Sequence, residues 1–468
     1  MKFFAIVFFV VFVNPNLQAQ SSETYTELVS LIQPNSSTLK LQKTININEV
    51  TGRVQDKSSA VEYRFVPKKL EFTKITPFLS FSCGWNEVND EADNSTISIR
   101  FSKDKTNWSD WTTIKTDEHY EKTNYSFVSQ LMEFDKGFVY YELKISSNLK
   151  KQGNSLQQLF LNFFSPGNVN STPARMNNAS TNNNRTSACG LAQPVFVNRA
   201  GWNCPQTSWG VGTTIVTHLI VHHAAGTNSS SDWGAVVLAI WNQHTGTNGY
   251  SDIGYNWLIA PDGVLYEGRY KSSTDNVTGA HFCGTNGGTM GVCMLGDYTN
   301  ITITSAARTK LVSLLGWKAC ERNLDALGNA FHASSNLTLN NISGHRDGCA
   351  TQCPGNTFYP DLPGVRIDVS NIMNGATPVS SINGLEEFSI GPNPVSNTAI
   401  MTLKLNTVKE VEYRILTADG KLLYQSSRQK LTGYVREELS MIKGITPGVY
   451  ILQLWVNNEM ISRKLIKQ

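Results

Sequence analysis

Two residues of types that bind zinc lie close together in one stretch of the chain. His345 and Cys353 are eight residues apart in the segment Ile342–Gly355, which reads I-S-G-H-R-D-G-C-A-T-Q-C-P-G. A further candidate lies far upstream, in the apolar run Leu219–Ala225 (L-I-V-H-H-A-A). Imidazole and thiolate are ligands that zinc prefers, and three protein ligands with one open position are typical of a catalytic site. The pattern therefore predicts a catalytic rather than a structural zinc centre.

The upstream candidate is one of two adjacent histidines, His222 and His223. On the β-strand expected here, neighbouring side chains point to opposite faces, so only one of the two can reach a given site. Taken alone, the pair is better explained as core or surface histidines. The downstream segments G-H-R-D and C-P-G favour a metal ligand instead.

The elements that position these residues follow an α/β pattern. Residues 189–375 alternate β-branched runs with stretches of helical spacing, and Asp262-Gly263 predicts a hairpin turn. The expected strands are Thr213–Ala224, Tyr255–Ala260, Val264–Glu267 and Thr289–Leu295, and the expected helices are Trp233–Thr245 and Thr304–Asn323. Thr304 is a suitable helix cap. We expect a mixed β-sheet flanked by helices.

The segment that precedes this one has a β texture. Residues 20–166 contain alternating runs such as Thr96–Ser102, Phe138–Ile145 and Gln158–Phe164, and they predict an accessory β-sandwich domain. Trp85, Trp108 and Trp111 pack this sandwich on the simpler interpretation, and stacking of exposed tryptophans on sugar rings is the alternative. Residues 167–188 have almost no large apolar side chains and predict a disordered linker.

The segment that follows the α/β pattern predicts a third unit. After a second linker at residues 376–385, residues 386–468 hold short β runs, with Asp419-Gly420 and Asn457-Asn458 as hairpin turns. The expected strands are Ala399–Leu405, Glu410–Thr417, Lys421–Gln425, Gly448–Val456 and Glu459–Ile466. We expect a small β-sandwich. The chain is thus predicted to be multidomain, with a central α/β domain between two β-sandwiches.

Composition limits the class of protein. A chain of 468 residues is too long for one ordinary core. The net charge of +3 and the lack of a long basic run argue against a nucleic-acid partner. Residues 1–19, with Lys2 and the apolar run Phe3–Val13, predict a signal peptide; a buried N-terminal strand is the alternative. We expect an exported monomer with no membrane span.

Export permits disulfides, and the chain has 8 cysteines. The sequence does not fix how they pair. The pairing we expect joins Cys189 to Cys204, Cys283 to Cys293 and Cys320 to Cys349. It leaves Cys353 free to bind metal, and it leaves Cys83 as a buried thiol.

Residues 189–375 resemble the zinc-dependent N-acetylmuramoyl-L-alanine amidases of the peptidoglycan recognition protein and phage T7 lysozyme superfamily. The similar segments follow the family's order: R-A-G-W (Arg199–Trp202), L-I-V-H-H-A-A, D-I-G-Y-N-W-L-I-A-P-D-G-V-L-Y-E-G-R (Asp252–Arg269), G-A-H (Gly279–His281), M-G-V-C-M-L-G-D-Y (Met290–Tyr298), and G-H-R-D with T-Q-C-P-G. The resemblance implies a Zn²⁺ enzyme that hydrolyses the amide bond between N-acetylmuramic acid and L-alanine in peptidoglycan.

The resemblance also implies the metal ligands and the catalytic groups. His222, His345 and Cys353 would hold zinc, which would lower the pKa of a bound water. Tyr255 and Thr351 would be catalytic. The Tyr255 hydroxyl would stabilise the oxyanion, a contribution typically worth about 3 kcal/mol. The proton donor to the leaving amine is left open.

Further positions are implied around this set. Arg269 and His281 match residues that line the family's peptide groove. Arg346 and Asp347 are expected to order the His345 loop rather than to react. Many members that prefer diaminopimelate peptides continue E-G-R with Gly-Trp, whereas Tyr270 and Lys271 follow here. The stem-peptide preference therefore stays open.

Residues 386–468 resemble the C-terminal sorting domain of the type IX secretion system of Bacteroidetes. The similar segments are F-S-I-G-P-N-P-V-S-N (Phe388–Asn397), Y-R-I-L-T-A-D-G-K (Tyr413–Lys421) and G-V-Y-I-L-Q-L (Gly448–Leu454). This resemblance implies a secreted or cell-surface protein whose partners are the secretion machinery and peptidoglycan. A generic adhesive β-sandwich is the alternative.

Two other functions compete with a secreted amidase. One is a peptidoglycan-binding recognition protein without catalysis; such proteins typically lack the ligand cysteine, and Cys353 is present. The other is a surface adhesin whose zinc only stabilises the fold. A structural zinc site usually has four protein ligands, and the sequence offers no fourth near His345 or Cys353.

Overall fold

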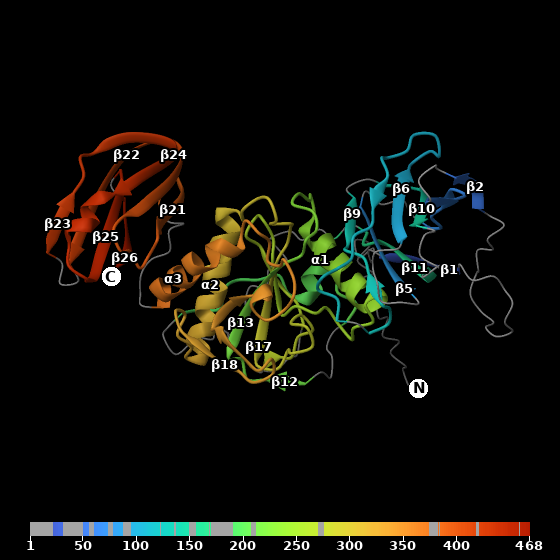
Figure 1. Ribbon diagram of the computed structural model, residues 1–468, viewed down its shortest axis with the longest axis horizontal. Helices are drawn as coiled ribbons and strands as arrows, with labels where there is room; N and C mark the ends of the chain where they lie inside the picture. Colours follow the sequence, from blue (N-terminus) through green and yellow to red (C-terminus); the bar gives the residue numbers. More distant parts are fainter. Residues whose placement is uncertain are drawn as a thin grey trace, which may run out of the picture.

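The computed structural model describes residues 22–30, 50–55, 60–73, 78–87, 95–121, 123–134, 137–148, 156–167, 169, 191–206, 212–269, 276–373, 382, 384–417, 421–457 and 459–468. The predicted signal peptide, most of both predicted linkers, Cys189, Tyr270 and Lys271 lie outside these residues. Within them, no helix is long and apolar enough to cross a membrane. Three regions follow one another along the molecule: N-terminal strands, a central domain with helices, and a C-terminal group of strands (Figure 1).

The N-terminal region consists of two antiparallel sheets. One contains β1 (Glu23–Ser30), β5 (Leu79–Glu87), β8 (Phe127–Val128), β9 (Met132–Phe134) and β11 (Leu156–Ser165). The other contains β2 (Val50–Gln55), β3 (Ala60–Phe65), β4 (Lys68–Lys69), β6 (Ser95–Ser102), β7 (Thr112–Thr113) and β10 (Tyr140–Asn148). Phe81 and Phe163 of the first sheet and Phe101 of the second belong to one buried cluster. The predicted strands near β6, β10 and β11 are confirmed.

The tryptophans of this region favour the simpler interpretation. Trp85 is buried in the shared cluster. The guanidinium of Arg100 lies 4.8 Å from the ring centre of Trp108 and 4.7 Å from that of Trp111. Lys144 is a further cation on the Trp111 ring, at 4.9 Å. Charged side chains of the same sheets therefore cover the rings that might have stacked on sugars.

The central domain is built on a five-stranded sheet with the order β15, β14, β17, β13, β20. These strands span Leu265–Glu267, Trp257–Ile259, Thr289–Met294, His218–His223 and Ile342–Gly344. Neighbouring strands are parallel except for β14 and β15, which form the predicted hairpin. The pattern is a mixed sheet, as expected. Two short strand pairs lie beside it, β12 (Thr213–Thr214) with β16 (Asn276–Val277) and β18 (Asn329–His332) with β19 (Leu337–Asn340).

Helices cover both faces of this sheet. Helix α1 (Trp233–Asn242) packs on one face, and α2 (Ser305–Arg322) and α3 (Leu362–Met373) pack on the other. Asp232 caps α1 by accepting a hydrogen bond from the Ala235 amide, and Thr304 caps α2 in the same way as predicted. One further turn of wider helix, Gln243–Thr247, extends α1.

The C-terminal region is rich in strands. It contains β21 (Leu385–Gly391), β22 (Ala399–Thr417), β23 (Leu422–Gln425), β24 (Gln429–Leu439), β25 (Gly448–Val456) and β26 (Glu459–Lys467). The first half of β22 pairs with β21 and β24, and its second half pairs with β25 and β23. Two strands predicted as separate, Ala399–Leu405 and Glu410–Thr417, are therefore halves of one strand, while β21 and β24 were not predicted.

The N-terminal region and the central domain share a core. Phe78 and Phe164 of the N-terminal sheets belong to the same buried cluster as Trp233 and Val237 of α1. Polar side chains bridge the same boundary; for example, the Asn162 Nδ2 donates to Asn242 Oδ1 at 2.9 Å. The two regions are therefore packed against each other along the α1 face, as Figure 1 shows for β5, β11 and α1.

The disulfide pairing differs from the expected one. Cys283 is joined to Cys349, and Cys320 is also disulfide-bonded, whereas Cys204 and Cys293 are free thiols. The expected pairs were wrong because Cys283 and Cys349 bond to each other and because Cys204 and Cys293, the latter buried in strand β17, are free. Two parts of the prediction are confirmed, since Cys353 is free and Cys83 is a buried thiol.

Candidate metal centre

The sheet brings the three predicted ligands together. His222 lies on β13, and His345 begins the short turn His345–Asp347 that directly follows β20. Strands β13 and β20 are parallel neighbours, so both histidines lie at the same edge of the sheet. The loop after His345 returns Cys353 to this edge, where the Cys353 Sγ lies 3.8 Å from His222 Nδ1.

The histidine pair is divided as strand alternation requires. His222 faces the other two predicted ligands, and its ring centre lies 4.5 Å from that of His345. His223 points the other way, and its Nδ1 accepts a hydrogen bond from the Tyr298 amide at 3.2 Å. His222, the predicted ligand, is therefore the histidine of the pair that lies beside His345 and Cys353.

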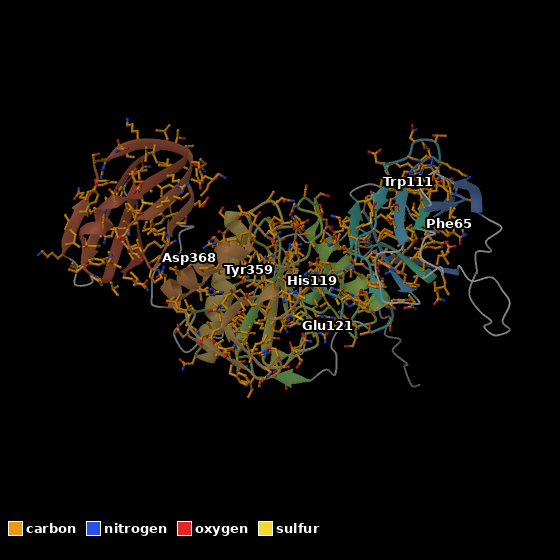
Figure 2. All side chains as sticks on the ribbon, viewed as in Figure 1. Phe65, Trp111, His119, Glu121, Tyr359 and Asp368 are labelled. Carbon is orange, nitrogen blue, oxygen red and sulfur yellow. A yellow bond between two sulfur atoms is a disulfide. The ribbon has the colours of Figure 1, made fainter. Side chains whose placement is uncertain are left out.

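A fourth side chain completes the group, and it comes from the N-terminal region. The ligand atoms of His119, His222, His345 and Cys353 all lie within 4.8 Å of one another. The rings of His119 and His345 are stacked, with centres 5.3 Å apart. Figure 2 shows His119 among the side chains of the central domain, although Trp111 and Phe65 of the same region lie far from it. The sequence offered no fourth candidate near His345 or Cys353, and His119 is a candidate that approaches them in space although it is distant along the chain.

These residues fit a bound zinc ion. The buried Nδ1 and Nε2 of His345 and the buried Nε2 of His119 have no hydrogen-bond partner. Burial and the neighbouring His345 lower the pKa of His222 well below its ordinary value, and burial and the neighbouring His119 do the same for His345. The neutral imidazoles of His222 and His345, next to a Cys353 side chain that is 1% exposed, are donors of the kinds that zinc prefers.

His281, predicted to line the groove, lies behind His222. Its Nδ1 is 3.0 Å from His222 Nε2, and its Nε2 is 3.2 Å from Thr289 Oγ1. The side chain is 1% exposed, and burial, with the charge of Arg269, lowers its pKa to about 3. A partner at Nε2 fixes the His222 ring so that Nδ1 faces the centre.

Arg269 is also inside the fold. Its Nε donates to the Ile253 carbonyl at 2.9 Å, and its Nη1 donates to the Thr278 carbonyl at 3.3 Å. The guanidinium thus ties together the loops on either side of Tyr255. In the described structure, both predicted groove residues contact protein groups rather than an open surface.

Other matching motifs serve the fold. The Arg199 guanidinium pairs with both carboxylate oxygens of Asp252 at 2.9 Å, and Trp202 Nε1 donates to the Glu267 carbonyl at 2.9 Å. Asn256 donates to the Val277 carbonyl and accepts from the Gly291 amide, both at 2.8 Å. These contacts fix the segment that carries Tyr255.

The predicted catalytic residues flank the centre. The ring centre of Tyr255 lies 5.3 Å from that of His222, and burial and the nearby Cys293 raise the tyrosine's pKa well above its ordinary value. Its hydroxyl therefore stays protonated and can donate. The Thr351 Oγ1 accepts from the Cys353 amide at 3.0 Å.

The loop between the two downstream ligands is held by its own residues. The Asp347 carboxylate accepts from the Gly344 amide at 2.8 Å and from the Tyr359 hydroxyl. Arg346 donates to the Cys353 carbonyl through its backbone amide at 3.1 Å and through Nε at 3.2 Å. The expectation that these two residues order the His345 loop is confirmed. The His223 amide donates to Cys353 Sγ at 3.3 Å, which helps to orient the thiol.

Sequence reasoning missed His119. It lies in the run D-E-H-Y-E (Asp117–Glu121), in the loop between β7 and β8. A histidine among four polar neighbours was the only signal, and such runs are usually solvated loops. Its role depends on a contact between residues more than one hundred positions apart, which no local pattern contains.

Comparisons with known proteins identify related families for two parts of the chain. Residues 212–356 match the family described as N-acetylmuramoyl-L-alanine amidase, and residues 389–468 match the secretion system C-terminal sorting domain. Peptidoglycan-recognition protein SC1a of Drosophila melanogaster is 33% identical over 178 residues, which are 37% of this chain and 88% of that protein. Peptidoglycan recognition protein 1 of Bos taurus is 31% identical over 148 residues, which are 31% of this chain and 69% of that protein.

Two solved structures are also similar. Drosophila peptidoglycan recognition protein SD is 24% identical, with a TM-score of 0.30, and the match covers 36% of this chain and 92% of that one. The endolysin amidase LysCS of Clostridium intestinale is 22% identical, with a TM-score of 0.28, and the match covers 37% and 97%.

The fold, the donor set and the sequence matches define a peptidoglycan-amidase type of domain joined to a sorting domain for export. The chain belongs to the peptidoglycan recognition protein family. Its sorting domain indicates export by type IX secretion, to the cell surface or into the medium.

Proposed function

We propose that this protein is a zinc-dependent N-acetylmuramoyl-L-alanine amidase that hydrolyses the amide bond between N-acetylmuramic acid and L-alanine in peptidoglycan. The observation that carries the proposal is the position of Cys353 beside His222 and His345, since two imidazoles and a thiolate form a complete ligand set for catalytic zinc. When bound, zinc supplies Lewis acidity, which polarises a carbonyl and activates water.

The surrounding residues keep the ligands in the required form. His281 holds the His222 ring through Nε2 and leaves Nδ1 for the metal. Burial keeps His222 and His345 neutral, and a neutral imidazole has the lone pair that a metal ligand needs. The His223 backbone amide donates a hydrogen bond to the Cys353 sulfur and so orients it. Arg346 donates to the Cys353 carbonyl and holds the loop that carries this residue.

Tyr255 is the proposed donor to the developing oxyanion. Its hydroxyl is protonated at all ordinary pH values because burial raises its pKa. Its ring lies beside His222, at the wall of a cavity also lined by His119 and His244. A fixed donor in a buried site stabilises negative charge without reorganisation, a contribution of about 3 kcal/mol.

Thr351 is the second proposed catalytic residue. Its hydroxyl lies two residues before Cys353 and accepts from the Cys353 amide at 3.0 Å, which fixes its position next to the sulfur. A hydroxyl can orient a water or a substrate amide by hydrogen bonding, but it is too weak an acid to be a strong general base. Arg269 and His281 support the site from behind in this proposal, rather than contacting the peptide.

A second candidate function is peptidoglycan recognition without catalysis. It is favoured by the relatives, several of which are named as recognition proteins. The two functions differ in their need for a metal. Recognition requires only a groove that binds peptidoglycan, whereas hydrolysis also requires a reactive metal ion. The ligand cysteine Cys353 favours catalysis here.

Mass spectrometry of digested peptidoglycan tests the proposal. The full-length protein is incubated with purified peptidoglycan, with zinc and with a chelator, and Cys353→Ser is the matched control. Free stem peptides that begin with L-alanine, formed only with zinc and only with Cys353, are expected. A different result would favour recognition alone. In that case the protein would sediment with the wall, but muropeptides would stay intact with the wild type and with the variant His119→Ala.

A further inference from the structure

A loop of the N-terminal region enters the metal centre. It connects β7 with β8, and its residues 117–121 reach across the boundary into the central domain. Figure 2 shows the labelled His119 and Glu121 among the side chains of the central domain. The His119 side chain is only 9% exposed, which is unusual for a residue of a loop tip.

The hydrogen bonding of His119 resembles that of a metal-bound histidine. The Nδ1 of His119 is 2.9 Å from the Asp117 carboxylate, and the other ring nitrogen, Nε2, has no partner although it is buried. His119 belongs to the group of four residues whose ligand atoms lie within 4.8 Å of one another. A carboxylate behind a histidine is the support that metal-bound histidines commonly have.

Two glutamates anchor the loop on either side of this histidine. The Glu118 carboxylate accepts from Thr351 Oγ1 at 2.9 Å and from the Gln352 amide at 2.8 Å. The Glu121 carboxylate accepts from the Phe282 amide at 3.1 Å and from Asn286 Nδ2 at 3.0 Å. Thr351, the proposed catalytic hydroxyl, is therefore occupied by a carboxylate of the chain itself.

A backbone amide of the loop and the residue Thr123, which follows it, also attach the loop to the central domain. The Glu121 amide donates to the Tyr250 hydroxyl at 2.6 Å, and the Thr123 hydroxyl donates to the Asn248 carbonyl. These contacts lie on the central domain next to helix α1, on which the N-terminal sheets pack. The loop is thus positioned by a large interface and does not depend on the metal for its place.

We propose that His119 is a fourth zinc ligand supplied by the N-terminal region, and that residues 117–121 close the metal centre against substrate. The inference rests on the proposed zinc site and adds its regulation. Zinc with four protein ligands has no open position for water or for a carbonyl oxygen. The chain as described is therefore a latent form, and activation requires the loop to leave.

Cobalt substitution tests the ligand set without any measurement of turnover. Co²⁺ replaces zinc in the full-length protein, and azide is added as a small external ligand while the visible spectrum is recorded. In the wild type, four protein ligands should leave the spectrum unchanged by azide. In His119→Ala, an open position should give a spectral shift that saturates with azide, and X-ray absorption should count one imidazole fewer.

Two further variants control for indirect effects. Thr123→Ala removes one anchor of the same loop but no ligand, so it should respond to azide as the wild type does. The double variant Glu118→Ala with Glu121→Ala keeps His119 but releases the loop, so it should show a partial response. This variant also covers the case in which His119→Ala does not fold.

Turnover then tests latency. His119→Ala should release stem peptides from peptidoglycan faster than the wild type, by about 10- to 100-fold, the range of typical coupling between two sites. Lower turnover in His119→Ala would overturn the proposal and make His119 a catalytic residue. Loss of metal together with unfolding of both loop variants would also overturn it and favour a structural zinc site.

The two proposals can fail separately. Azide binding to His119→Ala alone, with no turnover in any variant, would keep the fourth ligand and refute the amidase. Cys353-dependent turnover in the wild type, with spectra that are the same in the wild type and in His119→Ala, would keep the amidase and refute the fourth ligand.

Discussion

At the scale of single residues, Cys353 has the largest predicted effect. Cys353→Ser removes the thiolate but preserves the size of the side chain and the hydrogen bonds to its backbone. Turnover should fall by about 100-fold or more, because metal-ion catalysis contributes several kcal/mol. Zinc content should fall in parallel, and thermal unfolding measured with the chelator present should stay close to the wild type. Full activity in this variant would refute the ligand assignment.

His244 gives a prediction about pH. Its Nδ1 accepts from the Gly254 amide at 2.8 Å, and burial lowers its pKa to about 4. Between pH 6.5 and 4 the unfolded chain therefore binds a proton that the folded chain does not, so the free energy of unfolding falls as the pH falls. The full loss for this residue is about 3 kcal/mol.

The variant His244→Asn isolates this effect. An asparagine Oδ1 can accept from the Gly254 amide but does not titrate. Chemical denaturation at several pH values should therefore show a smaller loss of stability between pH 6.5 and 4 in the variant, with no difference in slope above pH 7. Equal slopes in the two proteins over the acidic range would contradict the assignment.

The residues of the central site show what a sequence pattern can and cannot predict. His222, His345 and Cys353 could be placed together because strand alternation and the family's segments fix their directions. The positions of Arg269 and His281 could not be predicted, because a matching position does not say whether a side chain faces a groove or a neighbour. That difference depends on the hydrogen bonds to Ile253 and His222, which appear only in three dimensions.

At the scale of elements, the disulfide joins two loops that hold the site. Cys283 follows the turn that contains His281, and Cys349 lies between His345 and Cys353. The closed loop spans 66 residues, so its removal by Cys283→Ser with Cys349→Ser should lower the free energy of unfolding by about 4 kcal/mol. Urea denaturation measures this change, and Cys204→Ser, which removes a free thiol, is the control.

Some helices and strands were predicted correctly from the sequence, and others were missed. Helix α2 was predicted because a threonine cap precedes a long amphipathic run. Helix α3 was missed because its sequence begins Leu362-Pro363-Gly364, which resembles a turn, although proline is tolerated in the first turn of a helix. Strand β22 was predicted as two strands because exposed residues near Val408 interrupt its apolar alternation. In the structure it is continuous, and it pairs with β24 on both sides of this interruption.

At the scale of the whole molecule, the sorting domain should be separable from catalysis. Arg463 of β26 lies 3.3 Å from Asp368 of α3, and Asp368 also pairs with Arg308 at 2.9 Å. Removal of residues 386–468 therefore leaves no unpaired carboxylate on the central domain. The truncated protein should cut peptidoglycan at the rate of the full chain but remain inside the producing cell, which fractionation and immunoblotting would measure. Normal export would contradict the sorting role.

The role of the N-terminal region could not be predicted from its sequence. Its strands were evident from alternation, but its loop contacts residues of the central domain that lie more than one hundred positions further along the chain. The tryptophans that suggested a glycan-binding surface are covered by Arg100 and Lys144. The loop at residues 117–121 carried no strong sequence pattern, yet it makes the contacts with the residues around the proposed metal centre.

Because His119 and the other three proposed ligands belong to one chain, the proposed opening of the centre has a further consequence. Within one chain, closure is independent of protein concentration, and a tethered partner acts at an effective concentration on the order of millimolar. One cut between residues 169 and 191 would turn closure into an encounter between two separate molecules. Dilution of the exported protein below the dissociation constant of the two parts would then be sufficient to free the centre, without any activating ligand.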